Sequence, residues 1–192
     1  DPIGLFQISG TPLNPREIAQ ILGDTTSSRA LGNSGPDRTL SLSIAGAQEK
    51  TALLFHDEQW MLPTGSTPTT HIFKLPLGII GNMKADMRTS VENEWLCSKI
   101  MHAYDIPIAH CEMAQFEDQK ALVVTRFDRR PSTDASWIIR LPQEDFCQAT
   151  GTPPTQKYQS DGGPSTAQIM EILLGSNQAQ PDRLNFYKTQ II

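Results

Sequence analysis

The segment from Ser43 to Thr51 has the residue types of a loop that cradles phosphate groups. Small residues around Gly46 join two strand-like runs, and such residues let backbone N–H groups approach phosphate oxygens. Two ionisable residues follow it: Lys74 on a strand-like run and Glu94 on a helical pattern. Taken singly, the three features also fit a hairpin turn, a solvated edge lysine and a surface carboxylate. Together they would support binding of a nucleotide.

The Lys50-Thr51 ending is similar to the end of a Walker A loop, but the surrounding sequence differs. A Walker A loop needs glycine before its lysine and runs from a strand into a helix. Position 49 is glutamate and the following residues are strand-like, so we exclude a P-loop NTPase. The order of loop, strand lysine, helical glutamate, two strands and a polar boundary instead fits the nucleotide-holding half of a kinase-like fold. The glycine-loop and lysine motifs of ordinary kinases are absent from the sequence.

Hydrophobic periodicity predicts the elements that must position these residues. We expect a short helix from Pro15 to Leu22, and then a loop from Thr25 to Asp37 because that stretch is rich in Ser, Thr, Gly, Asn and Pro. Three- and four-residue spacing predicts a helix from Arg88 to Tyr104 that packs on a sheet. Alternating or apolar runs predict the strands of that sheet at residues 40–44, 51–55, 60–62, 71–75, 109–116 and 121–125.

A second part of the chain is expected to be helical. The charged cluster from Arg126 to Arg130 interrupts the apolar pattern, so we place a boundary there, between residues 1–128 and 129–192. Ser165 to Gln168 fits a capping box, and Pro181 begins another helical pattern. The predicted fold class is α+β: an antiparallel sheet with one packed helix, like the N-terminal lobe of a protein kinase, and then the start of a helical C-terminal lobe.

Composition excludes several classes of protein. Sixteen basic and 21 acidic residues give a net charge of −5, which favours no direct contact with nucleic acid. No run approaches the roughly 18 apolar residues of a membrane helix, so a soluble, cytoplasmic protein is expected. Three widely spaced cysteines and the isolated histidines predict neither disulfides nor a metal site. The chain lacks an initial methionine and ends on Ile191-Ile192, as a piece of a longer protein would.

Five stretches of the sequence resemble HipA, the kinase toxin family of HipA–HipB toxin–antitoxin pairs. The similarity covers the chain in unbroken order and is strongest at residues 43–53, 68–76, 126–130, 140–145 and 158–164. The resemblance implies a serine/threonine protein kinase that uses ATP and Mg²⁺ to phosphorylate a glutamyl-tRNA synthetase or another translation protein. That reaction would inhibit translation and promote persistence, and the implied partner is a HipB-like helix-turn-helix antitoxin, through which any contact with DNA would be indirect.

The resemblance also implies roles for individual residues. Ser43 would be autophosphorylated, which would inactivate the kinase; the alternative is that Ser43 is only a small residue suited to a strand end. Lys74 would hold ATP phosphates, and Glu94 is our choice for its ion-pair partner. The implied phosphate-binding loop and the hinge that binds adenine comprise Ile44, Ala45, Gly46, Ala47, Gln48, Glu49 and Lys50, and Thr125, Arg126 and Phe127.

The family is roughly twice as long as this chain, a departure that limits what the chain can do alone. The resemblance implies that the catalytic loop and the metal ligands lie outside it, so we expect no catalytic or metal-binding residue here and no activity from the chain alone. A different class of function stays open: a split or degenerate relative that binds a nucleotide or a partner without transferring phosphate.

Overall fold

The computed structural model describes residues 8–30 and 48–192 of the chain. These residues form two compact units: one holds the described residues up to Lys99 together with Ala109–Arg140, and the other holds Ile100–Ile108 and Leu141–Ile192. The predicted strand at residues 40–44 lies outside the described residues, as do five predicted site residues: Ser43, Ile44, Ala45, Gly46 and Ala47.

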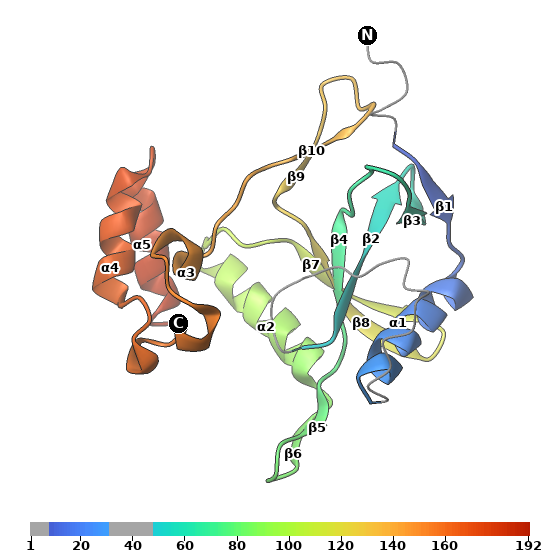
Figure 1. Cartoon of the computed structure of the whole chain (residues 1–192), viewed down its shortest axis with the longest axis horizontal. Coiled ribbons are helices and arrows are strands. Elements are labelled where there is room, and N and C mark those ends of the chain that lie inside the picture. Colours follow the sequence, from blue (N-terminus) through green and yellow to red (C-terminus); the bar gives the residue numbers. More distant parts are fainter. Residues whose placement is uncertain (1–7, 31–47) are drawn as a thin grey trace. The chain divides into compact units, whose positions relative to one another are not determined.

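The first unit is built on a six-stranded sheet in the order β1-β3-β2-β4-β8-β7. All of its neighbouring strands pair antiparallel, which confirms the predicted fold class (Figure 1). The two-residue turn between β2 and β3 has positive φ at Asp57 and Glu58, the conformation that matches the twist of a tight hairpin. The strands are β1 (Gly10–Pro12), β2 (Lys50–His56), β3 (Gln59–Pro63), β4 (His71–Lys74), β7 (Cys111–Phe116) and β8 (Gln119–Thr125).

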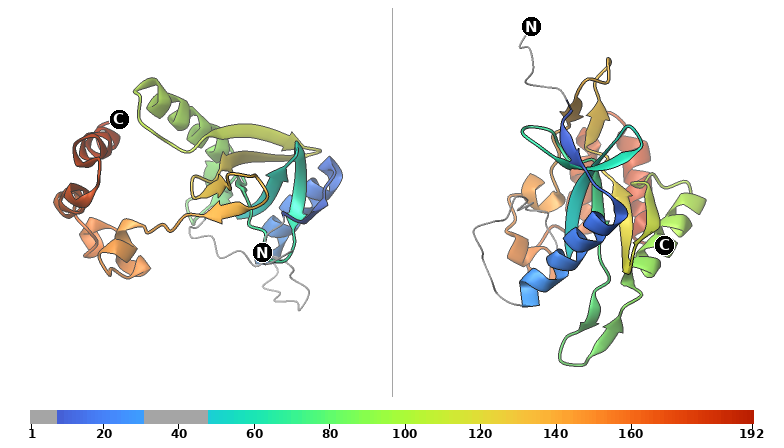
Figure 2. Two further views of the ribbon diagram at one scale, coloured as in Figure 1. Left: turned by 90° about the horizontal axis from the view of Figure 1, so that it is seen from above. Right: turned by 90° about the vertical axis from the view of Figure 1, so that its right-hand side faces the viewer.

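Helix α1 (Pro15–Ala30) covers one face of the sheet (Figure 2). Its Ile18 and Leu22 are buried against Leu53 of β2 and Phe73 of β4. The prediction of one packed helix was therefore incomplete, because this second helix also packs on the sheet. The apolar residues of α1 recur at a four-residue step, which turns them toward the sheet.

The predicted loop from Thr25 is wrong over its first residues, because α1 continues to Ala30. The N-terminus of α1 is capped by a capping box: Asn14 Oδ1 accepts from the Glu17 backbone N–H, and the Glu17 carboxylate accepts from the Asn14 N–H. Thr25 then donates its hydroxyl to the carbonyl of Ile21 at 2.8 Å. Once a helix is nucleated, each added residue gains a hydrogen bond, so polar residues of modest helix propensity extend it.

Helix α2 (Ser90–Ala103) provides the packed helix that the sequence predicted. Val91 is fully buried and lies with Leu122 of β8 and Cys111 of β7, and Trp95 packs against the same cluster. These strand residues alternate with those that face α1, so the first unit is a sheet between two helices (Figure 2).

Two short hairpins of the first unit were not predicted. One pairs β5 (Gly78–Ile80) with β6 (Ala85–Met87) and extends away from the sheet (Figure 1). The other pairs β9 (Arg129–Pro131) with β10 (Ile138–Arg140), so the first unit continues past residue 128, where we placed a boundary. The proposed division into kinase lobes stays a prediction. Three-residue strands give too few alternations for a pattern to be recognised.

The second unit contains the helices expected in the later part of the chain. The capping box predicted at Ser165 is present: Ser165 Oγ accepts from the Gln168 N–H, and Gln168 Oε1 accepts from the Ser165 N–H. Pro181 lies in the first turn of a helix that begins two residues earlier, at Ala179. The elements are α3 (Phe146–Ala149), α4 (Thr166–Ile172) and α5 (Ala179–Thr189), with short 3-10 turns η1 (Pro154–Gln156), η2 (Gln159–Asp161) and η3 (Leu173–Gly175).

Candidate functional site

Two lysines lie directly opposite each other at the end of the β2–β4 pair. Lys50 of β2 and Lys74 of β4 are register partners, so their side chains project from the same face of the sheet. Like charges at opposed positions repel and destabilise a sheet. The pKa of the Lys50 ammonium is lowered by burial and then by the charge of Lys74. This arrangement favours an anion that would neutralise both charges.

Glu94 of α2 provides one carboxylate for this pair of lysines. The Lys74 ammonium donates to Glu94 Oε1, and both side chains are partly buried. The contact that we predicted between Lys74 and Glu94 is therefore present. The Glu94 contact fixes the Lys74 ammonium opposite Lys50 at the end of β2.

A second ion pair, which we did not predict, also joins α2 to the sheet. Lys120 of β8 donates to Glu92 Oε1, and this hydrogen bond lowers the pKa of Glu92. Lys120 shares its face of β8 with Leu122, the buried partner of Val91. Residues two apart on a helix do not share a face, so no spacing in the sequence marked Glu92 as a second partner of the sheet. Two anchors hold this end of α2 on the sheet.

The last residues of the predicted phosphate-binding loop, Gln48 to Lys50, are hydrogen-bonded to β4 and to Leu75 after it. Gln48 donates its side-chain amide to the Leu75 carbonyl at 2.9 Å, and the Leu75 N–H donates to the Glu49 carbonyl at 3.0 Å. These bonds extend the β2–β4 pairing by one step beyond Lys50 and Lys74. Gln48, Glu49 and Lys50 therefore lie next to Lys74 and Leu75, whereas the loop residues before them lie outside the described chain. Their role in binding phosphate stays a prediction.

The predicted hinge residues lie at the end of β8 and just after it, and they differ in whether their backbone N–H groups are already hydrogen-bonded. The Thr125 N–H donates to His110 and the Arg126 N–H donates to Thr70, both to backbone carbonyls. Phe127 is 71% exposed, and its backbone N–H has no hydrogen bond to another residue of the described chain. Of the three, Phe127 is the best placed to offer a backbone donor to a ligand.

A buried carboxylate fixes the segment that carries the hinge. Asp128 is 4% exposed, and its oxygens accept from Arg126 at 2.7 and 3.0 Å and from Arg129 at 2.7 Å. The Arg126 side chain therefore contacts Asp128, and only its backbone belongs to the hinge. The hydrogen bonds from Arg126 are the main reason why the pKa of Asp128 lies below its usual range.

This depressed pKa predicts that the protein loses stability in acid. A carboxyl whose pKa is lower in the folded state stabilises the fold above its unfolded pKa, about 3.9 for aspartate, and loses that contribution as the pH falls toward the folded value. We expect the urea midpoint of unfolding to fall between about pH 5 and pH 3, and Asp128→Asn to flatten part of this dependence.

Asp118→Asn is the matched control for this experiment. Asp118 is exposed, so its replacement removes the same charge without touching the arginine contacts. The pH slope of this variant should equal that of the parent protein. An Asp128→Asn variant with an unchanged slope would contradict the assignment.

Among residues 8–30 and 48–192, no three His, Cys, Asp or Glu side chains are grouped so that they could hold a metal ion. Within the same residues, no helix combines the length and the apolar character needed to cross a lipid bilayer.

Comparisons with known proteins agree with this geometry. The model of the HipA-like C-terminal domain matches residues 42–192. The "Putative kinase Y4mE" of Sinorhizobium fredii is 38% identical over 165 residues, which are 85% of this chain and 36% of that protein. The serine/threonine-protein kinase toxin HipA of Shewanella oneidensis is 28% identical over 152 residues, 79% of this chain and 32% of that protein. The chain thus spans about a third of these relatives' length.

A solved structure shares the fold. The complex of HipA, HipB and operator DNA from Shewanella oneidensis contains a chain that matches with a TM-score of 0.68 and 22% identity, over 96% of this chain and 44% of that one. The family match covers the β2–β4 lysines, the α2 glutamates and the hinge. The chain belongs to the HipA-like C-terminal domain family and is related to the HipA kinase toxins.

Proposed function

We propose that the protein containing this chain is an ATP-dependent serine/threonine protein kinase toxin of HipA type. The observation that carries the proposal is the opposition of Lys50 and Lys74 on one face of the sheet, with Glu94 of α2 paired to Lys74. The phosphates of a triphosphate would interact favourably with two ammonium groups that lie side by side. In kinase-like folds a strand lysine held by a helical glutamate meets the phosphates of ATP.

In this proposal the remaining predicted residues complete the nucleotide site. The loop from Ile44 to Lys50 cradles the phosphates, and Gln48 holds the end of that loop to β4. The backbone of Phe127 binds the adenine edge, and its exposed ring offers an apolar surface beside the base. Mg²⁺ accompanies the ATP and bridges its phosphates.

The substrate and the partner are proposed from the relatives. The target is a glutamyl-tRNA synthetase or another translation protein in the cytoplasm, and its phosphorylation inhibits translation and promotes persistence. The similarity to HipA in a complex with HipB supports a HipB-type antitoxin as the partner. Autophosphorylation of Ser43 would place about −1.5 to −2 charge units next to the phosphate loop and oppose ATP binding.

The test uses the full-length protein with Mg-ATP and purified glutamyl-tRNA synthetase. We expect phosphoserine or phosphothreonine on the synthetase, together with a phosphorylated Ser43 peptide, in mass spectra of the reaction. A parallel reaction with a cell lysate extends the test: phosphate on a different translation protein there, and none on the synthetase, would change the proposed substrate but keep the proposed kinase. ATP binding without any transferred phosphate would instead indicate a non-catalytic nucleotide-binding module.

A further inference from the structure

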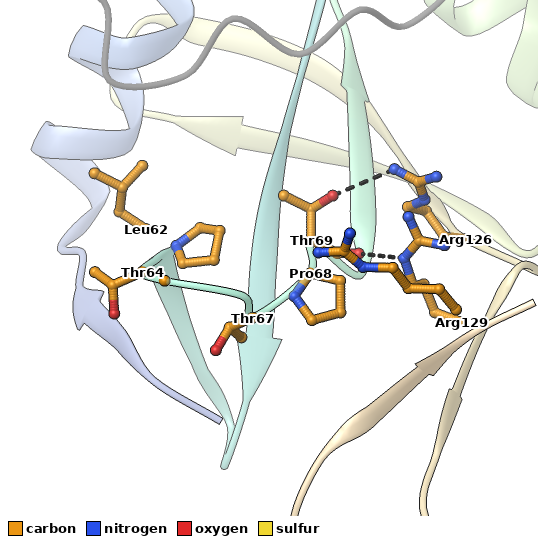
Figure 3. A pocket seen from close by; sticks show the side chains of 10 residues that line it. Leu62, Thr64, Thr67, Pro68, Thr69, Arg126 and Arg129 are labelled. Atoms are coloured by element: carbon orange, nitrogen blue, oxygen red, sulfur yellow. Dashed lines mark hydrogen bonds between the residues drawn. The ribbon is translucent and has the colours of Figure 1, made fainter. Parts of the chain in front are cut away.

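A pocket lies near the opposite end of β4 from Lys74. It has a volume of about 450 Å³ and is formed by the end of β3, the loop from Thr64 to Thr69, and three arginines. Figure 3 shows Arg126 and Arg129 beside Thr69 on one side of this pocket, with Thr64 and Thr67 along the loop. A pocket of this size is within the range that holds small ligands.

The pocket concentrates positive charge. Arg129 and Arg140 are opposed register partners in the β9–β10 hairpin, so they repeat the unfavourable pairing of like charges found at Lys50 and Lys74. Burial and the charges of Arg126 and Arg140 lower the pKa of Arg129. Asp128 contacts Arg126 and Arg129 and neutralises one of the three charges. Two positive charges remain without a carboxylate among the side chains that line the pocket.

Hydrogen bonds to neighbouring residues position the three arginine side chains and leave some of their N–H groups without an acceptor in the described chain. Arg126 donates to the Thr69 hydroxyl at 3.3 Å, and Arg129 Nε donates to the Thr69 carbonyl at 3.2 Å. Arg140 donates one Nη2 bond to the Ser66 carbonyl at 3.0 Å. No residue of the described chain accepts from Arg129 Nη2 or Arg140 Nη1. A guanidinium group that is positioned by some of its N–H groups can donate the remaining ones to the oxygens of a tetrahedral oxoanion such as phosphate.

We propose that this arginine pocket is a binding site for a phosphate group, separate from the nucleotide site. Arg129 and Arg140 contact the phosphate oxygens, and Thr69 and Asp128 hold the guanidinium groups in position. The phosphate is either a free ion or small ester, or the phosphorylated side chain of a protein. A carboxylate is a poorer fit because it carries one charge, whereas two unneutralised arginines favour a dianion.

The test measures phosphate binding directly and does not depend on kinase activity. The full-length protein is titrated calorimetrically with inorganic phosphate and with a phosphoserine peptide, and its melting temperature is followed in phosphate against chloride at equal ionic strength. We expect saturable binding, and a melting temperature that rises with phosphate concentration. Arg140→Ala should weaken binding about 10-fold, because a charge-assisted contact to the anion is lost.

Arg130→Ala is the matched control. Arg130 is an exposed neighbour on β9 that does not line the pocket, so this variant removes the same charge from the same hairpin. Its phosphate affinity should change less than about 2-fold at physiological salt. Tighter binding of the phosphopeptide than of inorganic phosphate would identify a phosphorylated protein as the ligand, and equal binding would identify the free ion. The proposal is wrong if neither probe binds saturably. It is also wrong if the Arg140 and Arg130 variants lose the same amount of phosphate affinity.

Discussion

Lys74→Met should weaken ATP binding by the full-length protein about 10- to 100-fold and abolish detectable phosphate transfer. The variant keeps the length of the side chain but removes the ammonium that lies opposite Lys50 and contacts Glu94. A hydrogen bond to a charged group contributes about 1.5–3 kcal/mol, which corresponds to this range of affinity. Equilibrium binding of a fluorescent ATP analogue measures the affinity, and phosphopeptide mapping measures the transfer.

Lys120→Met is the matched control. It shows whether Lys74 contributes to ATP binding by contacting the phosphates or only by holding α2 on the sheet. Lys120 also projects from the sheet toward α2, is similarly exposed, and pairs with Glu92 as Lys74 pairs with Glu94. Both variants therefore break one anchor of α2 and leave one glutamate unpaired. If Lys74 touches ATP, Lys120→Met should change ATP affinity less than about 3-fold. Equal losses in the two variants would show that Lys74 acts by holding α2, and the proposed phosphate contact would be wrong.

The sequence was sufficient to predict the sheet and the packed helix, because their patterns are long. Residues 51–55 and 109–125 carry clear strand patterns, and the helix around Trp95 repeats its apolar residues over several turns. The short hairpins that contain Gly78 and Arg140 were missed because three-residue strands carry almost no periodic signal. The end of α1 was misplaced because tertiary packing of Ile18 and Leu22 stabilises a helix whose last residues have low propensity.

Only part of the candidate site could be predicted from the sequence. Lys74 and Glu94 could be paired because a strand residue and a residue near the start of a packed helix meet on one face. The opposition of Lys50 and Lys74 needed the register itself, which a sequence pattern does not give. The arginines around Asp128 were recognised only as a charged interruption, because the β9–β10 hairpin that brings Arg140 beside Arg129 was not predicted.

Phe73→Ala should have the largest effect on stability, a loss of about 3–5 kcal/mol in the free energy of unfolding. Phe73 is fully buried in the centre of the sheet, and its ring lies 4.9 Å from that of Trp60 and 5.8 Å from that of Phe116. Its removal would leave a cavity under α1 that the surrounding rings cannot fill by small shifts. Since whole domains are stable by about 5–15 kcal/mol, much of the protein would be unfolded at moderate urea concentrations.

Phe55→Ala tests whether burial, rather than the loss of any aromatic ring, causes this effect. Phe55 also contacts Trp60, with ring centroids 4.7 Å apart, but it is 39% exposed at the end of β2. Water can occupy the space that its ring leaves, so we expect a loss of about 1–2 kcal/mol. Urea unfolding followed by tryptophan fluorescence compares the two variants. Similar losses in both would mean that the core of this unit does not centre on Phe73, and that Lys74, the next residue along β4, is less firmly positioned than the packing implies.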